Sequence, residues 1–215
     1  MDKEKLYFNN CTTKLLNKLF GLRRTFEPMP ALQQWLNMPI ALTEHDHIKA
    51  NGLQHYLNLN VMIWNEQELS LHFIGPMFSI AEFTIPYRFN LFAQRQISAE
   101  LGNYELLGKP DGLIASGYEE PEIPFFAFSE FKKEQEPSGD PAAQCLAAML
   151  VGQVLNQSTE LPMYGCYVNG RDWYFMTMVD KQYAISQGYD ALTDDIYDIM
   201  RILKALKEIV IARTA

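Results

Sequence analysis

Residues 125–132 have the sequence FFAFSEFK, and this stretch decides the fold class. Both of its alternating faces are apolar until Glu130, which is typical of a central strand in a sheet that is covered on both sides. Side chains two residues apart share one face of a strand, so Glu130 and Lys132 are expected to be neighbours over that buried surface. Charged groups there are costly unless they are paired or bound to a metal ion. The end of this strand is therefore a candidate functional site.

A second polar position precedes this strand in residues 108–114, which have the sequence GKPDGLI. Pro110 has no backbone N–H, so this point is expected to be a strand edge or a bulge close to a turn. If the strand that carries Asp111 pairs with residues 125–132, two carboxylates and the Lys132 ammonium converge at one place.

Such a cluster suits the hydrolysis of a phosphodiester. Asp111 and Glu130 would supply hard oxygen ligands for a magnesium or manganese ion, with the Phe131 carbonyl as a third ligand. The ion would polarise the phosphate and lower the pKa of an attacking water. For Lys132 the sequence leaves three roles open, which are to orient that water, to stabilise negative charge, or to act as a base.

The remaining pattern predicts an α/β protein with a mixed central sheet flanked by helices. The predicted helices are residues 11–22, 32–36, 44–57, 66–74, 141–156 and 193–212. The predicted strands are residues 79–85, 93–100, 107–115, 124–133, 163–169 and 172–179. Gly75 and Pro76 are expected to stop the fourth helix. Residues 1–40 are interpreted as an N-terminal helical extension and residues 41–215 as the main domain.

Pro110-Asp111, followed after an interval of eighteen residues by Glu130-Phe131-Lys132, resembles the PD-(D/E)XK nuclease superfamily. The match covers roughly residues 60–180. The resemblance implies a restriction-endonuclease-like core in the order α-β-β-β-α-β. It also implies metal binding by Asp111 and Glu130, a catalytic role for Lys132 and a nucleic-acid substrate, with DNA favoured over RNA.

Two further positions follow from this resemblance. Some branches add a glutamine in the helix after the lysine, which Gln144 matches, although the tyrosine that often follows is missing from residues 145–151. Many members carry a glutamate in the helix before the strands as another metal ligand. Glu68 is preferred over Glu66 for this place, and the alternative for Glu68 is a capping-box partner of Asn65.

Composition limits the other classes of protein. The 215 residues are 48% hydrophobic and 13% aromatic, which argues against general disorder, and no apolar stretch is long enough for a membrane span. Three widely spaced cysteines argue against a disulfide framework or a zinc site. The N-terminus lacks the apolar core of a signal peptide, so a cytoplasmic location is expected.

Charge complicates the choice of partner. The net charge of −8 disfavours a protein that coats nucleic acid, although residues 1–24 hold six bases and only two acids.

The expected function is a magnesium-dependent nuclease, and the alternative is a catalytically silent nuclease-fold module for binding or assembly. Glu130 and Lys132 as a plain structural ion pair, and Gln144 as a core amide, are the simpler alternatives for those residues. A homodimer formed through a terminal helix is a further expectation.

Overall fold

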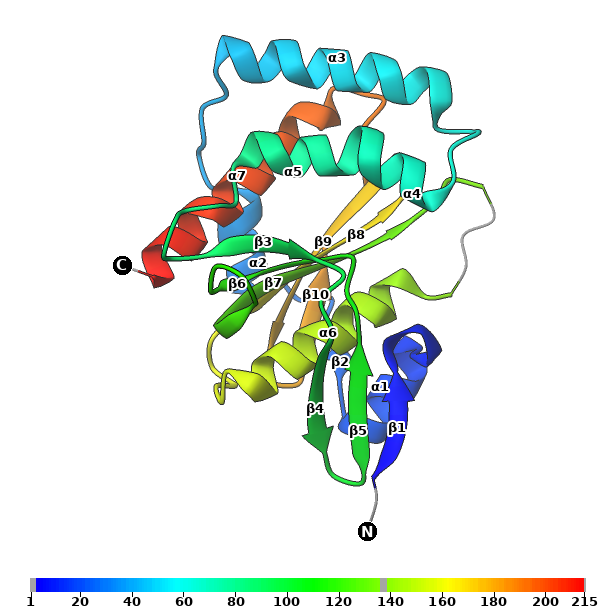
Figure 1. Ribbon diagram of the computed structural model, residues 1–215, viewed down its shortest axis with the longest axis vertical. Coiled ribbons are helices and arrows are strands. Elements are labelled where there is room, and N and C mark those ends of the chain that lie inside the picture. Colours follow the sequence, from blue (N-terminus) through cyan, green and yellow to red (C-terminus); the bar gives the residue numbers. More distant parts are fainter. Residues whose placement is uncertain (1–2, 136–138, 215) are drawn as a thin grey trace.

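A mixed β-sheet forms the centre of the protein in the computed structural model, which describes residues 3–135 and 139–214 (Figure 1). Its strand order is β2-β10-β9-β8-β7-β6-β3, and β11 also pairs with β9. The pairs β7–β8 and β2–β10 are parallel, and the other pairs are antiparallel. The strands are β2 (Arg23–Arg24), β3 (Asn90–Ala93), β6 (Gly112–Ser116), β7 (Glu122–Lys132), β8 (Met163–Asn169), β9 (Asp172–Val179), β10 (Gln182–Ile185) and β11 (Tyr189–Asp190). The prediction of a mixed sheet flanked by helices is confirmed.

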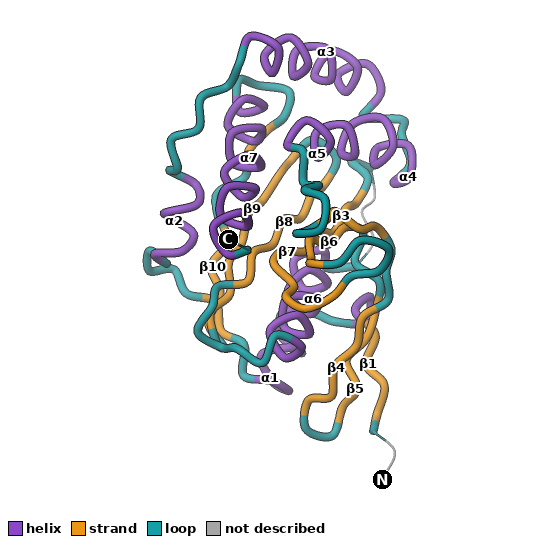
Figure 2. The backbone as a smooth tube through the Cα atoms, turned by 60° about the vertical axis from the view of Figure 1, so that its left-hand side comes forward, coloured by secondary structure: helices purple, strands orange, loops and turns teal. Residues whose placement is uncertain are grey.

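A smaller sheet of order β1-β5-β4 lies beside helix α6 (Figures 1 and 2). Its strands are β1 (Glu4–Tyr7), β4 (Ile97–Leu101) and β5 (Tyr104–Gly108). Strand β1 runs parallel to β5, and β4 and β5 form an antiparallel hairpin. Residues 3–8 are therefore tied to a part of the chain about one hundred positions later.

Helices cover both faces of the central sheet, and each face has its own apolar core (Figure 2). One core gathers α2 (Pro30–Leu36), α3 (Glu44–Asn60), α4 (Glu66–Leu69), a π-helical turn (Ser70–Ile74), α5 (Gly75–Ala81) and α7 (Asp195–Arg213). The other gathers α1 (Thr13–Phe20), a short 3₁₀ helix (Phe8–Asn10) and α6 (Pro141–Leu155). Within the described residues no helix has the length and apolar character needed to cross a membrane.

Helix α6 and the hairpin that follows it confirm the sequence patterns. The Asp140 carboxylate accepts a hydrogen bond from the Ala143 N–H, and Pro141 occupies the first helical turn. The helix is apolar nearly all round and is buried from Ala143 to Gln153. Strands β8 and β9 have the predicted bounds, and Gly170 has the positive φ of 56° that their tight turn requires.

The prediction of a helix stop at Gly75-Pro76 and a strand at 79–85 is wrong. The helical segment continues from α4 through the π-helical turn into α5, which ends at Ala81. In the π-helical turn the Gly75 N–H donates to the Ser70 carbonyl, so hydrogen bonding changes register just before Pro76. The proline then falls in the first turn of a new α-helical segment, where its missing N–H costs little.

Two other predicted strands are each divided. Residues 107–115 form the end of β5 and most of β6, which belong to different sheets and are separated by Lys109, Pro110 and Asp111. Residues 93–100 span the end of β3 and most of β4. The proline breaks the ladder as expected, but the chain uses the break to cross from one sheet to the other.

The N-terminal forty residues are part of the main body, and they are not a purely helical extension. They contribute β1 to the smaller sheet and β2 to the larger one. Trp35 in α2 is completely buried, and its ring N–H donates to the Ile202 carbonyl of α7 at 2.8 Å. The same ring meets Tyr164 and Phe175 edge to face. Strands β1 and β2 were missed because they are short strands with charged residues.

An ion pair fastens α3 to α7, and its removal should be measurable. The Lys204 ammonium donates to the Asp46 carboxylate at 2.6 Å, and the same carboxylate accepts from the backbone N–H and the hydroxyl of Thr43. Burial alone would raise the pKa of Asp46, but the hydrogen bonds from Lys204 and Thr43 outweigh it and lower the pKa to about 2. This contribution to stability is fully present above pH 3.8 and is lost as the pH falls towards 2.

We expect Asp46→Ala to lower the free energy of unfolding by about 1–3 kcal/mol at pH 7, because a helix cap and a mostly buried pair are lost together. The difference from the unmodified protein should shrink at pH 2. Urea unfolding of both proteins at pH 7 and pH 2 measures this difference in the free energy of unfolding. The control is Glu100→Ala, which removes the solvent-exposed pair with Lys3 and should cost at most about 0.5 kcal/mol. An equal loss in both variants would contradict the prediction.

Candidate functional site

Asp111 lies at the point where the chain enters β6, directly beside the end of β7. Gly112, the first residue of β6, pairs with Ser129 of β7. One Asp111 carboxylate oxygen accepts a hydrogen bond from the Phe131 backbone N–H at 2.7 Å. Strand pairing therefore brings Asp111 next to Glu130-Phe131-Lys132, which is the juxtaposition expected from the sequence.

The Lys132 ammonium is surrounded by oxygen atoms. It donates to the Glu130 carboxylate at 2.7 Å and to the Phe131 carbonyl at 3.0 Å. A third oxygen, from the half-exposed Glu66 carboxylate at the start of α4, lies 3.5 Å from it. Glu130 and Lys132 are only 7% and 6% exposed. Two carboxylates and one backbone carbonyl thus converge on a single cation in an environment with little water.

The cluster holds more negative than positive charge, and the pKa values reflect this. Burial, assisted by the charge of Asp111, raises the pKa of Glu130 to about 7. Burial also raises the pKa of Asp111. For Lys132, burial by itself would lower the pKa, but Glu130, Glu66 and Asp111 together raise it above its usual value. The ammonium form of Lys132 is the form that this site stabilises, so the lysine is better suited to balance negative charge than to accept a proton.

The oxygen donors of the site are of the kind that magnesium and manganese ions prefer. Asp111 and Glu130 offer carboxylate oxygens, and the Phe131 carbonyl already faces the Lys132 cation beside Glu130. Among residues 3–135 and 139–214, no three His, Cys, Asp or Glu side chains are grouped so as to hold a metal ion. Magnesium is commonly held by one or two carboxylates plus waters and substrate phosphates, so two carboxylates are sufficient for this ion.

Glu66, and not the preferred Glu68, is the glutamate of α4 that reaches the site. The Glu68 carboxylate accepts from the Asn65 backbone N–H at 2.8 Å, and the Asn65 side chain accepts from the Glu68 N–H at 2.9 Å. Glu68 therefore serves the capping box. Residues two positions apart on a helix are related by a rotation of about 200° about the helix axis, so their side chains point to nearly opposite sides. The two glutamates therefore cannot both face Lys132.

Gln144 remains next to the site. It is buried in the first turn of α6, and together with Glu130 it lines a cavity of about 290 Å³. The cavity lies between α6 and the smaller sheet, because Tyr7, Leu107 and Lys109 also line it. The sequence did not predict this cavity, since β1 was not expected to reach this place.

Gln94 is a site residue that the sequence did not reveal. Its side-chain amide donates to the second Asp111 carboxylate oxygen, the one not bonded to Phe131. Gln94 has a positive φ of 55°, a conformation that non-glycine residues adopt rarely. Both oxygens of Asp111 are thus held by donors, which fixes the direction of the carboxylate. No motif marks Gln94, and only the pairing of β3 with β6 brings it here.

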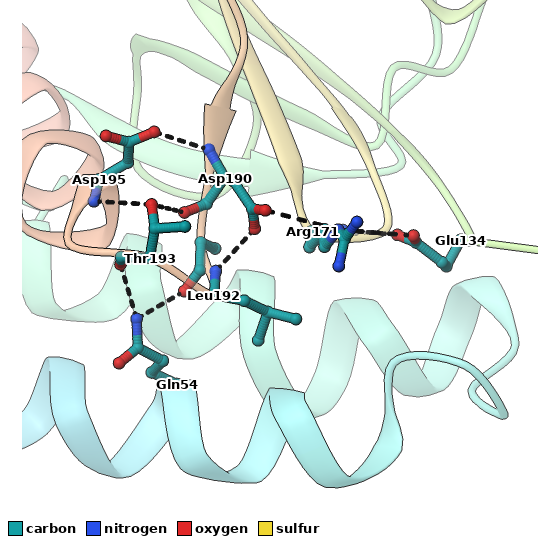
Figure 3. Close-up of polar contacts among 8 residues, drawn as sticks. Gln54, Glu134, Arg171, Asp190, Leu192, Thr193 and Asp195 are labelled. Atoms are coloured by element: carbon teal, nitrogen blue, oxygen red, sulfur yellow. Dashed lines mark hydrogen bonds and ion pairs between the residues drawn. The ribbon is translucent and has the colours of Figure 1, made fainter.

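A separate polar network holds the chain just beyond Lys132 (Figure 3). Arg171 lies 3.7 Å from both Glu134 and Asp190, and its backbone N–H donates to Glu134 at 3.0 Å. On the other side, the Gln54 amide of α3 donates to the Ala191 and Thr193 carbonyls. The network links the end of β7 to the β8–β9 turn and joins α3 to the start of α7. Its role is structural.

No protein-family model and no curated protein sequence matches this chain. The site is therefore interpreted from its own geometry and chemistry.

Proposed function

We propose that this protein is a magnesium- or manganese-dependent nuclease of the PD-(D/E)XK type. The observation that carries the proposal is the contact of Asp111 with the Glu130-Phe131-Lys132 segment on the paired strands β6 and β7. The order of the surrounding elements supports it. Helix α5, strands β3, β6 and β7, helix α6 and the parallel strand β8 follow one another along the chain, with β4 and β5 of the smaller sheet between β3 and β6. Apart from those two strands, this order is the α-β-β-β-α-β order that the resemblance implies.

The chain's own residues would divide the chemistry as follows. Asp111 and Glu130 would hold the ion, and the Phe131 N–H and the Gln94 amide keep the Asp111 carboxylate in a fixed direction. When bound, the ion polarises the phosphate and lowers the pKa of an attacking water. The Lys132 ammonium stabilises the negative charge that develops on the phosphate oxygens. Of the three roles left open by the sequence, the raised pKa of Lys132 favours this one.

Manganese binding and cleavage, measured together, test the proposal. The unmodified protein is expected to bind Mn²⁺ in a calorimetric titration and to cut single- or double-stranded DNA or RNA, with all cleavage stopped by EDTA. Asp111→Asn keeps a hydrogen-bond acceptor for the Phe131 N–H but removes the charge. It should weaken Mn²⁺ binding by at least about 10-fold, since even outer-sphere partners contribute about 10–100-fold.

The matched control is Asp194→Asn, which changes an exposed aspartate that makes no capping contact at the start of α7. It should leave Mn²⁺ binding and cleavage unchanged. If the unmodified protein and Asp111→Asn bind Mn²⁺ equally and neither cuts any of these substrates, the protein is a catalytically silent module for binding or assembly.

A further inference from the structure

The cavity beside Glu130 is lined by a different set of residues from the charged cluster around Lys132. Its polar lining residues are Asn9, Gln96 and Gln144, which carry amides, Lys109, which carries an ammonium, and Glu130. Tyr7 and Phe8 also line it, and Tyr7 is 46% exposed.

These groups match the parts of one nucleotide. Amide side chains offer both donors and acceptors, which is what the polar edge of a nucleobase requires. An exposed tyrosine ring provides a surface on which any base stacks. Lys109 lies two residues before Asp111 in the sequence and lines the same cavity as Glu130, so the wall carries a cation of the kind that a phosphate requires.

We propose that this cavity receives one unpaired nucleotide adjacent to the phosphate that is cut, so that the preferred substrate is a single strand or a frayed end. The inference rests on the proposed nuclease function. The size of the cavity is in keeping with a small-molecule unit, because about 290 Å³ is close to the roughly 300 Å³ at which the range of ligand sites begins. A base pair held inside a duplex presents its edges only in the grooves and cannot enter such a space unless it is unpaired.

The charge of the protein supports the same substrate. Affinity for a duplex comes largely from many phosphate contacts made by lysine and arginine, and the net charge here is −8. Capture of one nucleotide needs only the single ammonium of Lys109, with stacking and amide hydrogen bonds supplying the rest. Binding of one nucleotide therefore needs fewer positive charges than binding of a duplex, which suits an acidic protein.

Fluorescence anisotropy of labelled DNA tests the inference, with Ca²⁺ as the divalent ion to suppress turnover. The unmodified protein should bind a short single-stranded oligonucleotide at least about 10-fold more tightly than a blunt hairpin duplex of the same composition, a difference that the hydrogen bonds of two amide side chains can supply. Asn9→Ala/Gln96→Ala should abolish that preference. The control Gln34→Ala/Asn58→Ala removes exposed amides on α2 and α3, outside the cavity, and should retain it.

Hydrolysis of bis(p-nitrophenyl) phosphate, a phosphodiester with no nucleobase, separates the two proposals. Asn9→Ala/Gln96→Ala should hydrolyse it as fast as the unmodified protein in Mn²⁺. Equal affinity for single strand and duplex, or an unchanged preference in the cavity variant, overturns the inference while leaving the nuclease proposal in place. If the unmodified protein shows no metal-dependent hydrolysis of this compound, the nuclease proposal is overturned instead.

Discussion

Replacing Glu130 with glutamine is expected to abolish metal-dependent cleavage and, at the same time, to stabilise the folded protein at pH 8. Glutamine keeps an oxygen that can accept from the Lys132 ammonium but removes the charge proposed to bind the metal. Loss of a direct ligand should cost at least about 100-fold in activity, because outer-sphere partners alone contribute about 10–100-fold. The gain in stability follows from the unfavourable burial of this carboxylate.

The sign of the pH dependence comes from the raised pKa of Glu130. Because the pKa is about 7 in the folded protein and 4.5 in the unfolded chain, the folded state holds the proton more tightly between these values. Stability is therefore highest below pH 4.5 for this group and declines as the pH rises to 7. The ionised carboxylate costs on the order of 3 kcal/mol at pH 8, since one pKa unit corresponds to about 1.4 kcal/mol. Urea unfolding between pH 4.5 and pH 8 measures the decline.

In Glu130→Gln this decline should flatten, so the gain in stability over the unmodified protein should grow between pH 4.5 and pH 7 and be complete above pH 7. Glu68→Gln is the control, because Glu68 belongs to the capping box and does not contact Lys132. It should leave cleavage unchanged and cost at most about 1 kcal/mol. A Glu130→Gln variant that is inactive and also less stable at pH 8 would show that the carboxylate is a structural ion-pair partner of Lys132.

Trp35→Ala is expected to destabilise the protein by about 3–5 kcal/mol, the usual cost of deleting a large buried aromatic side chain. The ring is completely buried between α2, α7 and the central sheet, and its N–H is bonded to the Ile202 carbonyl. The loss is a large share of the 5–15 kcal/mol that stabilises a typical domain. Chemical unfolding followed by far-UV circular dichroism measures it.

Phe26→Ala is the matched control from the same N-terminal region. Phe26 is 87% exposed, so its removal should change the free energy of unfolding by no more than about 0.5 kcal/mol. If Trp35→Ala also lay within that range, residues 1–40 would be an appendage that the main domain does not need.

The core of the site was predictable because it depends on local patterns. An apolar strand that ends in Glu130 and Lys132 fixes which residues share a face, and Pro110 marks the neighbouring strand entry. Strand pairing then needs only the right neighbour to bring Asp111 to Phe131. Metal binding and catalysis by these residues remain predictions.

The rest of the site depends on contacts between distant segments, which a single sequence does not encode in any local signal. Gln94 reaches Asp111 only because β3 lies beside β6. Glu66 and Glu68 fit the same helical turn equally well, and the direction of α4 relative to β7 decides between them. The cavity beside Gln144 exists only because β1 pairs with β5.

Two local sequence signals around Gly75 led to wrong predictions of secondary structure. Glycine followed by proline usually ends a helix, but the π-helical turn before Gly75 moved the proline into a tolerated position. Apolar β-branched and aromatic residues in 79–85 suggested a strand, while Ile80 and Ala81 in fact complete helix α5. Short apolar runs do not distinguish the two structures by periodicity alone.

The pairing of β1 with β5 and of β2 with β10 also determines when the fold can close during synthesis. Glu4 has no partner until Tyr104 has left the ribosome, and Arg23 has none until Gln182 has done so. Both pairings join segments that are about 100 or more positions apart, and contacts so distant in sequence form slowly. In a nascent chain, β1 would stay unpaired until β5 emerges and β2 until β10 emerges, and each would be open to proteases and chaperones until then.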